Sequence, residues 1–341
     1  MGDVAMTVPV IDTLAKTYPH LRITILSRRF AHAFFENLSP NVYFMEADIY
    51  NEYKGIHGLN VLYRRLKAKN FTAIADLHDV LRTKYLRTRF VIDHYKVKHI
   101  NKHRSEKRKL TRKNHKILRQ LPTSFENYAD VFKELGYPIE LSPADNNRQW
   151  EPKYKENVSH TLGEKDENKY WIGIAPFAAH QGKIYPIEKM EKVVKQLSAD
   201  EKHQLFFFGA GPHEKEIIDD WCHKYERCIN ASAKLSGIGD ELALMKQLDV
   251  MLSMDSANMH LASLTNTPVI SIWGATHPYA GFMGWNQPQN NAIQMDMDCR
   301  PCSIYGNKKC FRKDYACMNQ IDESVIVQKI KDTISNKNIN N

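Results

Sequence analysis

The segment MDSANMHLA, residues 254–262, begins at the end of an apolar run at Val250–Met254. An apolar run that stops at an acidic residue and is followed by Ser256 is typical of a strand that turns into a capped helix, with His260 one turn inside it. Such a turn directs free backbone N–H groups and the positive end of the helix dipole at a ligand above the sheet, and diphosphate is a natural occupant. The alternative is an ordinary capped helix that carries a surface histidine.

Around this segment, from residue 168 onward, short apolar runs alternate with longer amphipathic stretches. This alternation predicts a parallel sheet wrapped by helices, the α/β class. The expected strands are Tyr170–Ala175, Gln204–Phe208, Val250–Met254, Val269–Trp273 and Ala292–Met297, and the expected helices are Ile187–Leu197, His213–Tyr225, Asp240–Leu248 and Asn258–Leu264. The first half repeats the plan less clearly, with expected strands at Arg22–Leu26, Val42–Glu46, Thr72–Leu77 and Phe90–Asp93.

The 341 residues, 43% of them hydrophobic, are enough for two domains. Proline and polar residues cluster over Pro138–Lys169, which we interpret as the linker. We expect an N-terminal domain over 1–150, a C-terminal domain over 151–320, and a final helix and tail over 321–341. No apolar stretch is long enough to span a membrane and no secretory signal is evident, so the sequence predicts a cytoplasmic protein.

The apolar residues between Val4 and Tyr18 follow helical spacing, although Pro9 falls within them. Asp3 is therefore expected at the turn before the first helix. Because doubly wound domains normally open on a strand, we expect the first strand to be missing from this chain.

The formal net charge is +9, and most of the excess lies between Arg82 and Arg119, where Asp93 and Glu106 are the only acids. Such a run favours an anionic partner: a phosphorylated glycolipid, a membrane surface or a nucleic acid. Few aromatic residues interleave it, so a stacking platform for single-stranded nucleic acid is not evident. A solvated helix or a partly disordered loop is the alternative.

Four of the six cysteines, Cys299, Cys302, Cys310 and Cys317, fall close together. Four thiols suffice for a tetrahedral structural zinc, but the second pair is spaced too widely for an ordinary zinc knuckle. We therefore expect no metal and keep these cysteines as weaker metal candidates. All six are expected to be reduced.

Four segments carry a resemblance to a known family. In order they are GDV (2–4) running into TVP (7–9), APFAA (175–179) leading to KIYP (183–186), FGAGPHE (208–214) and DSANMHLA (255–262). Their order and spacing resemble the ADP-heptose:lipopolysaccharide heptosyltransferase family across nearly the whole chain, the first strand excepted. The resemblance implies a GT-B architecture: two facing Rossmann-like doubly wound domains about a central cleft, with the acceptor on the N-terminal domain and the nucleotide-sugar on the C-terminal one.

The family's chemistry is an inverting, metal-independent transfer without a cofactor. The resemblance implies that heptose, or a similar sugar, moves from an ADP-sugar to a lipopolysaccharide core or another surface glycan. It places Lys183, Asp255, Ser256 and His260 against the nucleotide diphosphate and sugar, and it makes Asp3 the general base. A compact positive charge such as Lys183 suits a departing diphosphate. Judged without the family, Asp3 would instead be expected to cap the first helix.

Three further positions are expected to lie at the donor-binding site. Gly209 lets the backbone approach a ligand closely, and Glu214 has a carboxylate able to accept from ribose or adenine. Ala257 stands where the family commonly has glycine, which leaves less room beside the diphosphate. With the first strand missing, Asp3 would be poorly held, so we expect this chain to be weakly active or inactive and a form extended upstream by about ten residues to be competent.

Two other functions stay open on the sequence. One is a GT-B enzyme that uses another nucleotide-sugar, as a transferase or an epimerase. The other is a zinc-stapled, basic nucleic-acid-binding protein. We favour an anionic glycolipid acceptor and peripheral contact of the 82–119 segment with the inner membrane surface, and no specific nucleic acid.

Overall fold

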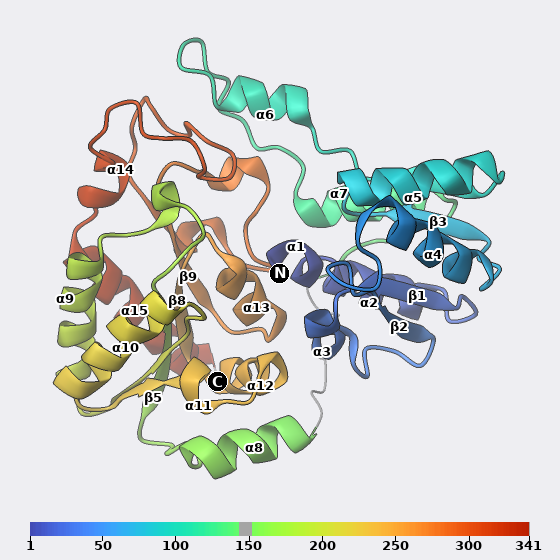
Figure 1. Cartoon of the computed structure of the whole chain (residues 1–341). Helices are drawn as coiled ribbons and strands as arrows, with labels where there is room; N and C mark the ends of the chain where they lie inside the picture. Colours follow the sequence, from blue (N-terminus) through green and yellow to red (C-terminus); the bar gives the residue numbers. More distant parts are fainter. Residues whose placement is uncertain (143–151, 341) are drawn as a thin grey trace. The chain divides into compact units, whose positions relative to one another are not determined.

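The computed structural model describes residues 1–142 and 152–340, and these group into two units (Figure 1). The first unit holds residues 3–102 and 122–142, and the second holds 103–121 and 152–340. Residues 103–121, which the sequence placed in the N-terminal domain, thus group with the second unit. The expected linker includes a helix, α8 (Pro152–Leu162), and its residues 143–151 lie outside the described part.

The second unit is built on a six-stranded parallel sheet of order β10-β9-β8-β5-β6-β7. Its strands are β5 (Tyr170–Ala175), β6 (His203–Phe207), β7 (Cys228–Asn230), β8 (Val250–Met254), β9 (Val269–Trp273) and β10 (Ala292–Gln294). The central strands are continuous apolar runs because helices cover both faces; in Figure 1 the sheet lies between α9, α10 and α15 on one side and α12 and α13 on the other. The strand order reverses between β5 and β8, which makes this the topological switch point.

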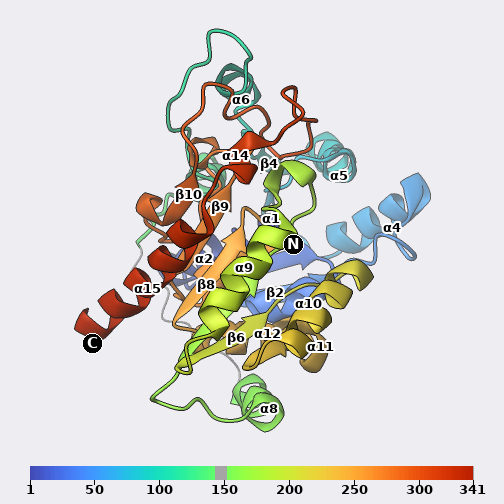
Figure 2. The same ribbon diagram turned by 90° about the vertical axis from the view of Figure 1, so that its left-hand side faces the viewer.

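The helices of the second unit follow the alternation that the sequence predicts. They are α6 (Arg104–Leu110), α8, α9 (Ile187–Ser198), α10 (Pro212–Lys224), α11 (Ala231–Lys234), α12 (Ile238–Gln247), α13 (Ala257–Leu264), α14 (Ala316–Asn319) and α15 (Glu323–Asn340), with 3-10 turns at Gln181–Lys183, Pro278–Ala280 and Gln289–Asn291. Figure 2 shows α9 and α15 across one face of the sheet. Fully buried Val193 and Leu197 of α9 and Ile330 of α15 pack there on the strands and form the core.

The first unit contains two separate parallel strand pairs. They are β1 (Ile23–Ser27) with β2 (Val42–Glu46), and β3 (Ala73–Asp76) with β4 (Lys96–His99). The helices are α1 (Gly2–Ala5), α2 (Val8–Thr17), the 3-10 turn Arg29–Ala31, α3 (His32–Phe35), α4 (Gly55–Lys67), α5 (Leu81–Ile92) and α7 (Ser124–Glu134).

Two expectations for the first unit are wrong. Phe90 does not begin a strand; it lies near the end of α5, where its buried ring packs 5.0 Å from that of Tyr63 and 5.1 Å from that of Tyr95. A short apolar run fits a buried helix end as well as a strand, and tertiary packing decides. Asp3 lies inside α1 rather than ahead of the first helix, and Pro9 is accommodated because it stands in the first turn of α2.

Among the described residues, none of the helices is both long and apolar enough to cross a bilayer.

Candidate functional site

The second unit brings four of the predicted donor residues to the switch point of its sheet. β5 and β8 are neighbours, with Ala175 of β5 paired to Ser253 of β8. The loop after β5 leads to Lys183, and the loop after β8 holds Asp255 and the start of α13. Ligands of doubly wound sheets bind outside the carboxyl ends of the strands at such a reversal. The topology therefore offers an independent reason to look for the donor here.

Lys183 and Asp255 form an ion pair in this position. Lys183 Nζ lies 2.9 Å from Asp255 Oδ2, and their side chains are only 15% and 4% exposed. The Oδ2 atom has no hydrogen-bond partner among the described residues, so the contact is an ion pair rather than an aligned hydrogen bond. Lys183 is therefore largely shielded from solvent rather than a surface lysine.

The stem of Lys183 is clamped by the loop that carries the cysteines. Gly306 has a φ of +75°, and a Cβ added to it would lie 2.6 Å from Lys183 Cγ. A side chain at Gly306 would therefore displace the lysine as well as strain the backbone. On the other side, the Gly182 carbonyl accepts a hydrogen bond of 2.8 Å from the Ala275 backbone N–H. Gly306 is a site residue that the sequence did not reveal, because only the fold brings it to Lys183.

The start of α13 differs in one respect from the expected cap. Ser256 occupies the N-cap position, but its side chain makes no capping hydrogen bond and its Oγ lies 3.3 Å from Ser253 Oγ. The first N–H groups of α13, which begins at Ala257, are therefore not capped by this serine. His260 is 6% exposed, so it is a buried side chain and not a surface histidine.

The glycine loop after β6 is stabilised from within. Glu214 Oε2 accepts from the backbone N–H groups of Ala210, at 2.8 Å, and Gly211, at 3.3 Å. The bond from Gly211, the N-cap residue of α10, satisfies a backbone N–H that the helix itself leaves without a partner. Glu214 thus has a local structural role, alongside the expected contact with ribose or adenine.

A second carboxylate reaches this loop through a serine. The Gly209 N–H donates to Ser232 Oγ at 3.3 Å, and Ser232 Oγ donates to Glu241 Oε1 at 2.7 Å. Burial raises the pKa of Glu241. Ser232 and Glu241 were not predicted, since they come from the two later helices α11 and α12 and only the fold brings them to this loop.

The four clustered cysteines line one pocket of the second unit and are all free thiols. Burial raises the pKa of Cys302, and that of Cys317 to about 11. Within residues 1–142 and 152–340, the structure holds no group of three or more His, Cys, Asp or Glu side chains arranged to bind a metal.

Two cations hold the cysteine loop in place. Arg300 is 4% exposed and donates to the carbonyls of Gly274 and Thr276. Lys116 Nζ donates to the carbonyls of Cys299, at 2.8 Å, and Pro301, at 2.9 Å. Lys116 belongs to the basic run, so part of that run has an intramolecular structural role.

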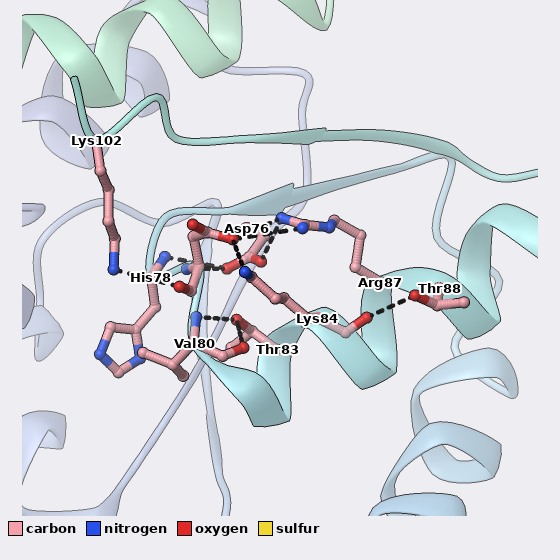
Figure 3. Close-up of polar contacts among 9 residues, drawn as sticks. Asp76, His78, Val80, Thr83, Lys84, Arg87, Thr88 and Lys102 are labelled. Carbon is pink, nitrogen blue, oxygen red and sulfur yellow. Dashed lines mark hydrogen bonds and ion pairs between the residues drawn. The ribbon is translucent and has the colours of Figure 1, made fainter. Parts of the chain in front are cut away.

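In the first unit, a polar network occupies the end of β3 (Figure 3). Asp76 Oδ1 accepts from the backbone N–H groups of His78, at 3.0 Å, and Asp79, at 2.9 Å. Arg87 bridges the two acids, with Nη1 3.1 Å from Asp76 Oδ2 and 3.3 Å from Asp79 Oδ1. Lys84 Nζ lies 3.7 Å from the same Asp79 oxygen. Two more cations of the basic run are therefore neutralised within the fold.

The imidazole of His78 points away from this network (Figure 3) and lies within electrostatic reach of Asp3. Burial lowers the pKa of His78, and the Asp3 carboxylate opposes that shift. The Asp3 backbone carbonyl accepts from the Tyr128 hydroxyl at 3.3 Å, while its side chain is exposed. The predicted base is thus a solvent-accessible carboxylate held through its backbone.

These features define an α/β protein whose second unit has the topology of a nucleotide-binding domain. The sequence model of glycosyltransferase family 9 (heptosyltransferase) matches residues 60–311. The chain belongs to glycosyltransferase family 9, and it is a glycosyltransferase. The resemblance seen in the sequence is confirmed.

Relatives and solved structures agree. Lipooligosaccharide heptosyltransferase 2 of Campylobacter jejuni is 21% identical over 354 residues, which cover 99% of this chain and 97% of the relative. A family 9 glycosyltransferase from Veillonella parvula superposes with a TM-score of 0.72 at 21% identity, covering 98% and 95% of the two chains. An E. coli heptosyltransferase solved with ADP superposes with a TM-score of 0.61 at 16% identity, and the superposition covers 98% of this chain and 97% of the other. The α/β class, matching GT-B heptosyltransferase structures, is confirmed.

Proposed function

We propose that this enzyme transfers heptose from ADP-heptose to the core of a lipopolysaccharide, with inversion and without a metal ion. The observation that carries the proposal is the buried Lys183–Asp255 pair at the switch point of the second unit, in a chain of this family. Relatives named as heptosyltransferases of lipopolysaccharide or lipooligosaccharide support the sugar and the acceptor.

In this proposal the donor is bound by charged side chains and by backbone N–H groups. Lys183 and the uncapped start of α13 at Ser256 and Ala257 receive the diphosphate, since N–H groups at a helix start and a lysine both favour phosphate oxygens. Asp255 fixes the lysine, and His260 lines the same helix start. Gly209 and Glu214 approach the ribose or adenine. The E. coli heptosyltransferase solved with ADP supports adenine over other bases.

The base in this proposal is Asp3. Its carboxylate takes the proton from the acceptor hydroxyl as the oxygen attacks the anomeric carbon of heptose. The bond from that carbon to the diphosphate breaks on the opposite face, and ADP leaves with the electron pair. Lys183 and the α13 N–H groups stabilise the charge that develops on the leaving oxygen.

The acceptor of such an enzyme is an anionic glycolipid at the inner face of the cytoplasmic membrane. The basic segment 82–119 supports contact with that surface, since clustered cations are attracted to anionic headgroups. Arg87 and Lys116 are already engaged within the fold, so only part of the segment is available for it.

A thermal-shift panel of nucleotides and nucleotide-sugars tests the donor, because a ligand that binds the native state raises the unfolding temperature. We expect ADP and ADP-heptose to stabilise the protein and UDP or UDP-sugars not to. Transfer of heptose to a heptose-deficient core acceptor, followed by mass spectrometry, tests the reaction. Stabilisation by UDP-sugars alone would instead support the alternative of a GT-B enzyme with another donor.

A further inference from the structure

Two loops of the second unit lie side by side and share an unusual surface. The first, residues 108–119, comprises the end of α6 and the loop after it, and the second, residues 304–313, belongs to the cysteine loop. Both views place them next to each other (Figures 1 and 2). Lys113 Nζ lies 5.6 Å from the ring centroid of Phe311, which joins the two loops directly. The Leu121 N–H donates to the Tyr279 carbonyl at 2.9 Å and anchors the end of the first loop.

Both loops expose large apolar side chains. The exposed fractions are 45% for Ile117, 54% for Leu118, 48% for Tyr305 and 49% for Phe311. A single exposed apolar residue is ordinary, but several on adjoining loops are typical of an interaction surface. Beneath them, buried Leu110, Leu121 and Ala280 form a small core, so the loops are supported from below.

The same two loops are strongly cationic. Their exposed cations include Arg108, Arg112, Lys113, Lys308, Lys309 and Lys313, none of which forms an ion pair with another described residue. Over 107–119 and 302–314 the only acid is Asp314, and Arg312 pairs with it at 2.9 Å. Asp298, which lies outside these segments, acts electrostatically on Lys116, but the six unpaired cations still outnumber the acids described near the loops.

We propose that this basic apolar face, residues 108–119 with 304–313, docks on an anionic lipid bilayer. Exposed aliphatic and aromatic tips surrounded by cations suit the headgroup region, where apolar side chains enter and the cations stay at the level of the phosphates. The proposal rests on the proposed function, because a membrane-borne acceptor requires the enzyme to reach the bilayer. It names the part of the basic run that makes the contact.

A nucleic acid fits the face less well. Its charge would attract phosphate of either source, and Tyr305 and Phe311 offer rings on which a base could stack, but Ile117 and Leu118 offer none. In a bilayer the same side chains lose their contact with water. A bilayer therefore takes all four exposed apolar side chains out of water, whereas a nucleic acid would leave Ile117 and Leu118 exposed.

The α5 helix is the rival surface on the basic run. It exposes Leu81, at 86%, and Ile92, at 64%, and it carries cations of its own. There, however, Lys84 and Arg87 are paired with buried acids, so fewer cations of the helix remain unpaired. The charge available to headgroups is lower on α5 than on the basic apolar face.

Co-sedimentation with vesicles tests the proposal, with equal parts phosphatidylcholine and phosphatidylglycerol compared with phosphatidylcholine alone. The full chain should bind the anionic vesicles, and less as salt rises. The variant Arg112→Ala/Lys308→Ala should weaken binding roughly 25-fold, about fivefold for each cation removed. Ile117→Ser/Leu118→Ser should weaken it by at least about tenfold, because two apolar groups no longer leave water.

The matched control is Leu81→Ser/Ile92→Ser on α5, which should leave vesicle binding unchanged. All of these substitutions are at exposed positions. An unchanged circular dichroism spectrum and an unchanged thermal shift with ADP would verify that each variant folds. The proposal is overturned if the α5 control loses binding while the loop variants keep it. It is also overturned if Arg112→Ala/Lys308→Ala lowers retention on single-stranded DNA while no vesicle binding is found.

A transferase assay separates this inference from the proposed function. With a short water-soluble core glycan as acceptor, the loop variants should match the parent chain, since no membrane contact is needed. Loss of transfer to that glycan in every form, with vesicle binding intact, would refute the transferase proposal and leave the docking face standing. Normal transfer to the glycan without any vesicle binding would refute the docking face and leave the transferase proposal standing.

Discussion

Lys183 Nζ and Asp255 Oδ2 lie 2.9 Å apart, almost buried, although the two residues come from loops after different strands. The pair connects the loop after β5 to the loop after β8 at the point where the strand order reverses. In the proposed donor site, an ammonium held in this way would need no rearrangement when the charge of the leaving group develops.

Lys183→Ala should lower transfer by about 10²–10³-fold, the usual effect of removing a group aimed at developing charge. It should also destabilise the protein by about 3 kcal/mol, since Asp255 would be left as an unpaired buried carboxylate. The double variant Lys183→Met/Asp255→Asn removes both charges and should recover stability without recovering activity. Thermal unfolding and transfer rates check this, and normal turnover by Lys183→Ala would remove this lysine from the donor site.

His260→Ala should weaken ADP-sugar binding or turnover while the chain still folds. The side chain is buried at the start of α13, where a bound diphosphate would meet it. Binding of ADP-sugar by calorimetry and turnover are the measurements. His260→Gln, which keeps a polar side chain of similar reach, serves as the comparison; full activity in both variants would contradict the assignment.

Asp3→Asn should abolish transfer and leave the affinity for ADP-sugar nearly unchanged. The amide has almost the same shape as the carboxylate but cannot take the proton of the acceptor hydroxyl. Calorimetry with ADP-sugar and a transfer assay distinguish the two effects. Near-normal turnover by the Asn variant would rule out Asp3 as the base.

Arg87→Ala should destabilise the first unit by about 3 kcal/mol, because the nearly buried Asp76 and Asp79 would lose the guanidinium that bridges them. The matched control is Arg82→Ala on the same helix, an exposed residue whose loss should change stability by less than about 0.5 kcal/mol. Urea unfolding of the full chain measures both. Equal effects of the two substitutions would show that the bridge does not stabilise this unit.

The cysteine loop should contain less than one zinc per chain on elemental analysis. The thiols of Cys302 and Cys317 should also react slowly with iodoacetamide at neutral pH, because burial raises the pKa of both and keeps them protonated. Since a raised thiol pKa means that thiolate forms only in alkali, the rate should climb towards pH 10. One tightly held zinc per chain would instead make the loop a metal staple.

Sequence predicted the second unit better than the first. β5, β8 and β9 were placed at their observed bounds because strands buried on both faces are continuous apolar runs. β4, with the sequence KVKH, was missed because half of it is charged, and the three-residue β7 was missed as well.

The functional site was also predicted only in part, because its contacts join residues that are distant in the sequence. Lys183 and Asp255 could be named from motifs, but their ion pair could not, since nothing local to either residue indicates the other. Glu241 and Gly306 were missed for this reason. Residues 103–121 were assigned to the wrong unit because a charged segment gives no sign of a partner as distant as Pro301, which is 185 positions from Lys116.

The second unit is discontinuous in the chain, and this has a consequence for how the protein is made and divided. On the ribosome, residues 103–121 emerge long before Tyr279, Phe282 and Ile304, against which they pack, so the second unit cannot mature until synthesis is nearly complete. A fragment cut at the linker would lack this piece of its own core. Recombinant halves intended for separate study should therefore carry the 103–121 peptide with the C-terminal half, joined by a circular permutation or added in trans.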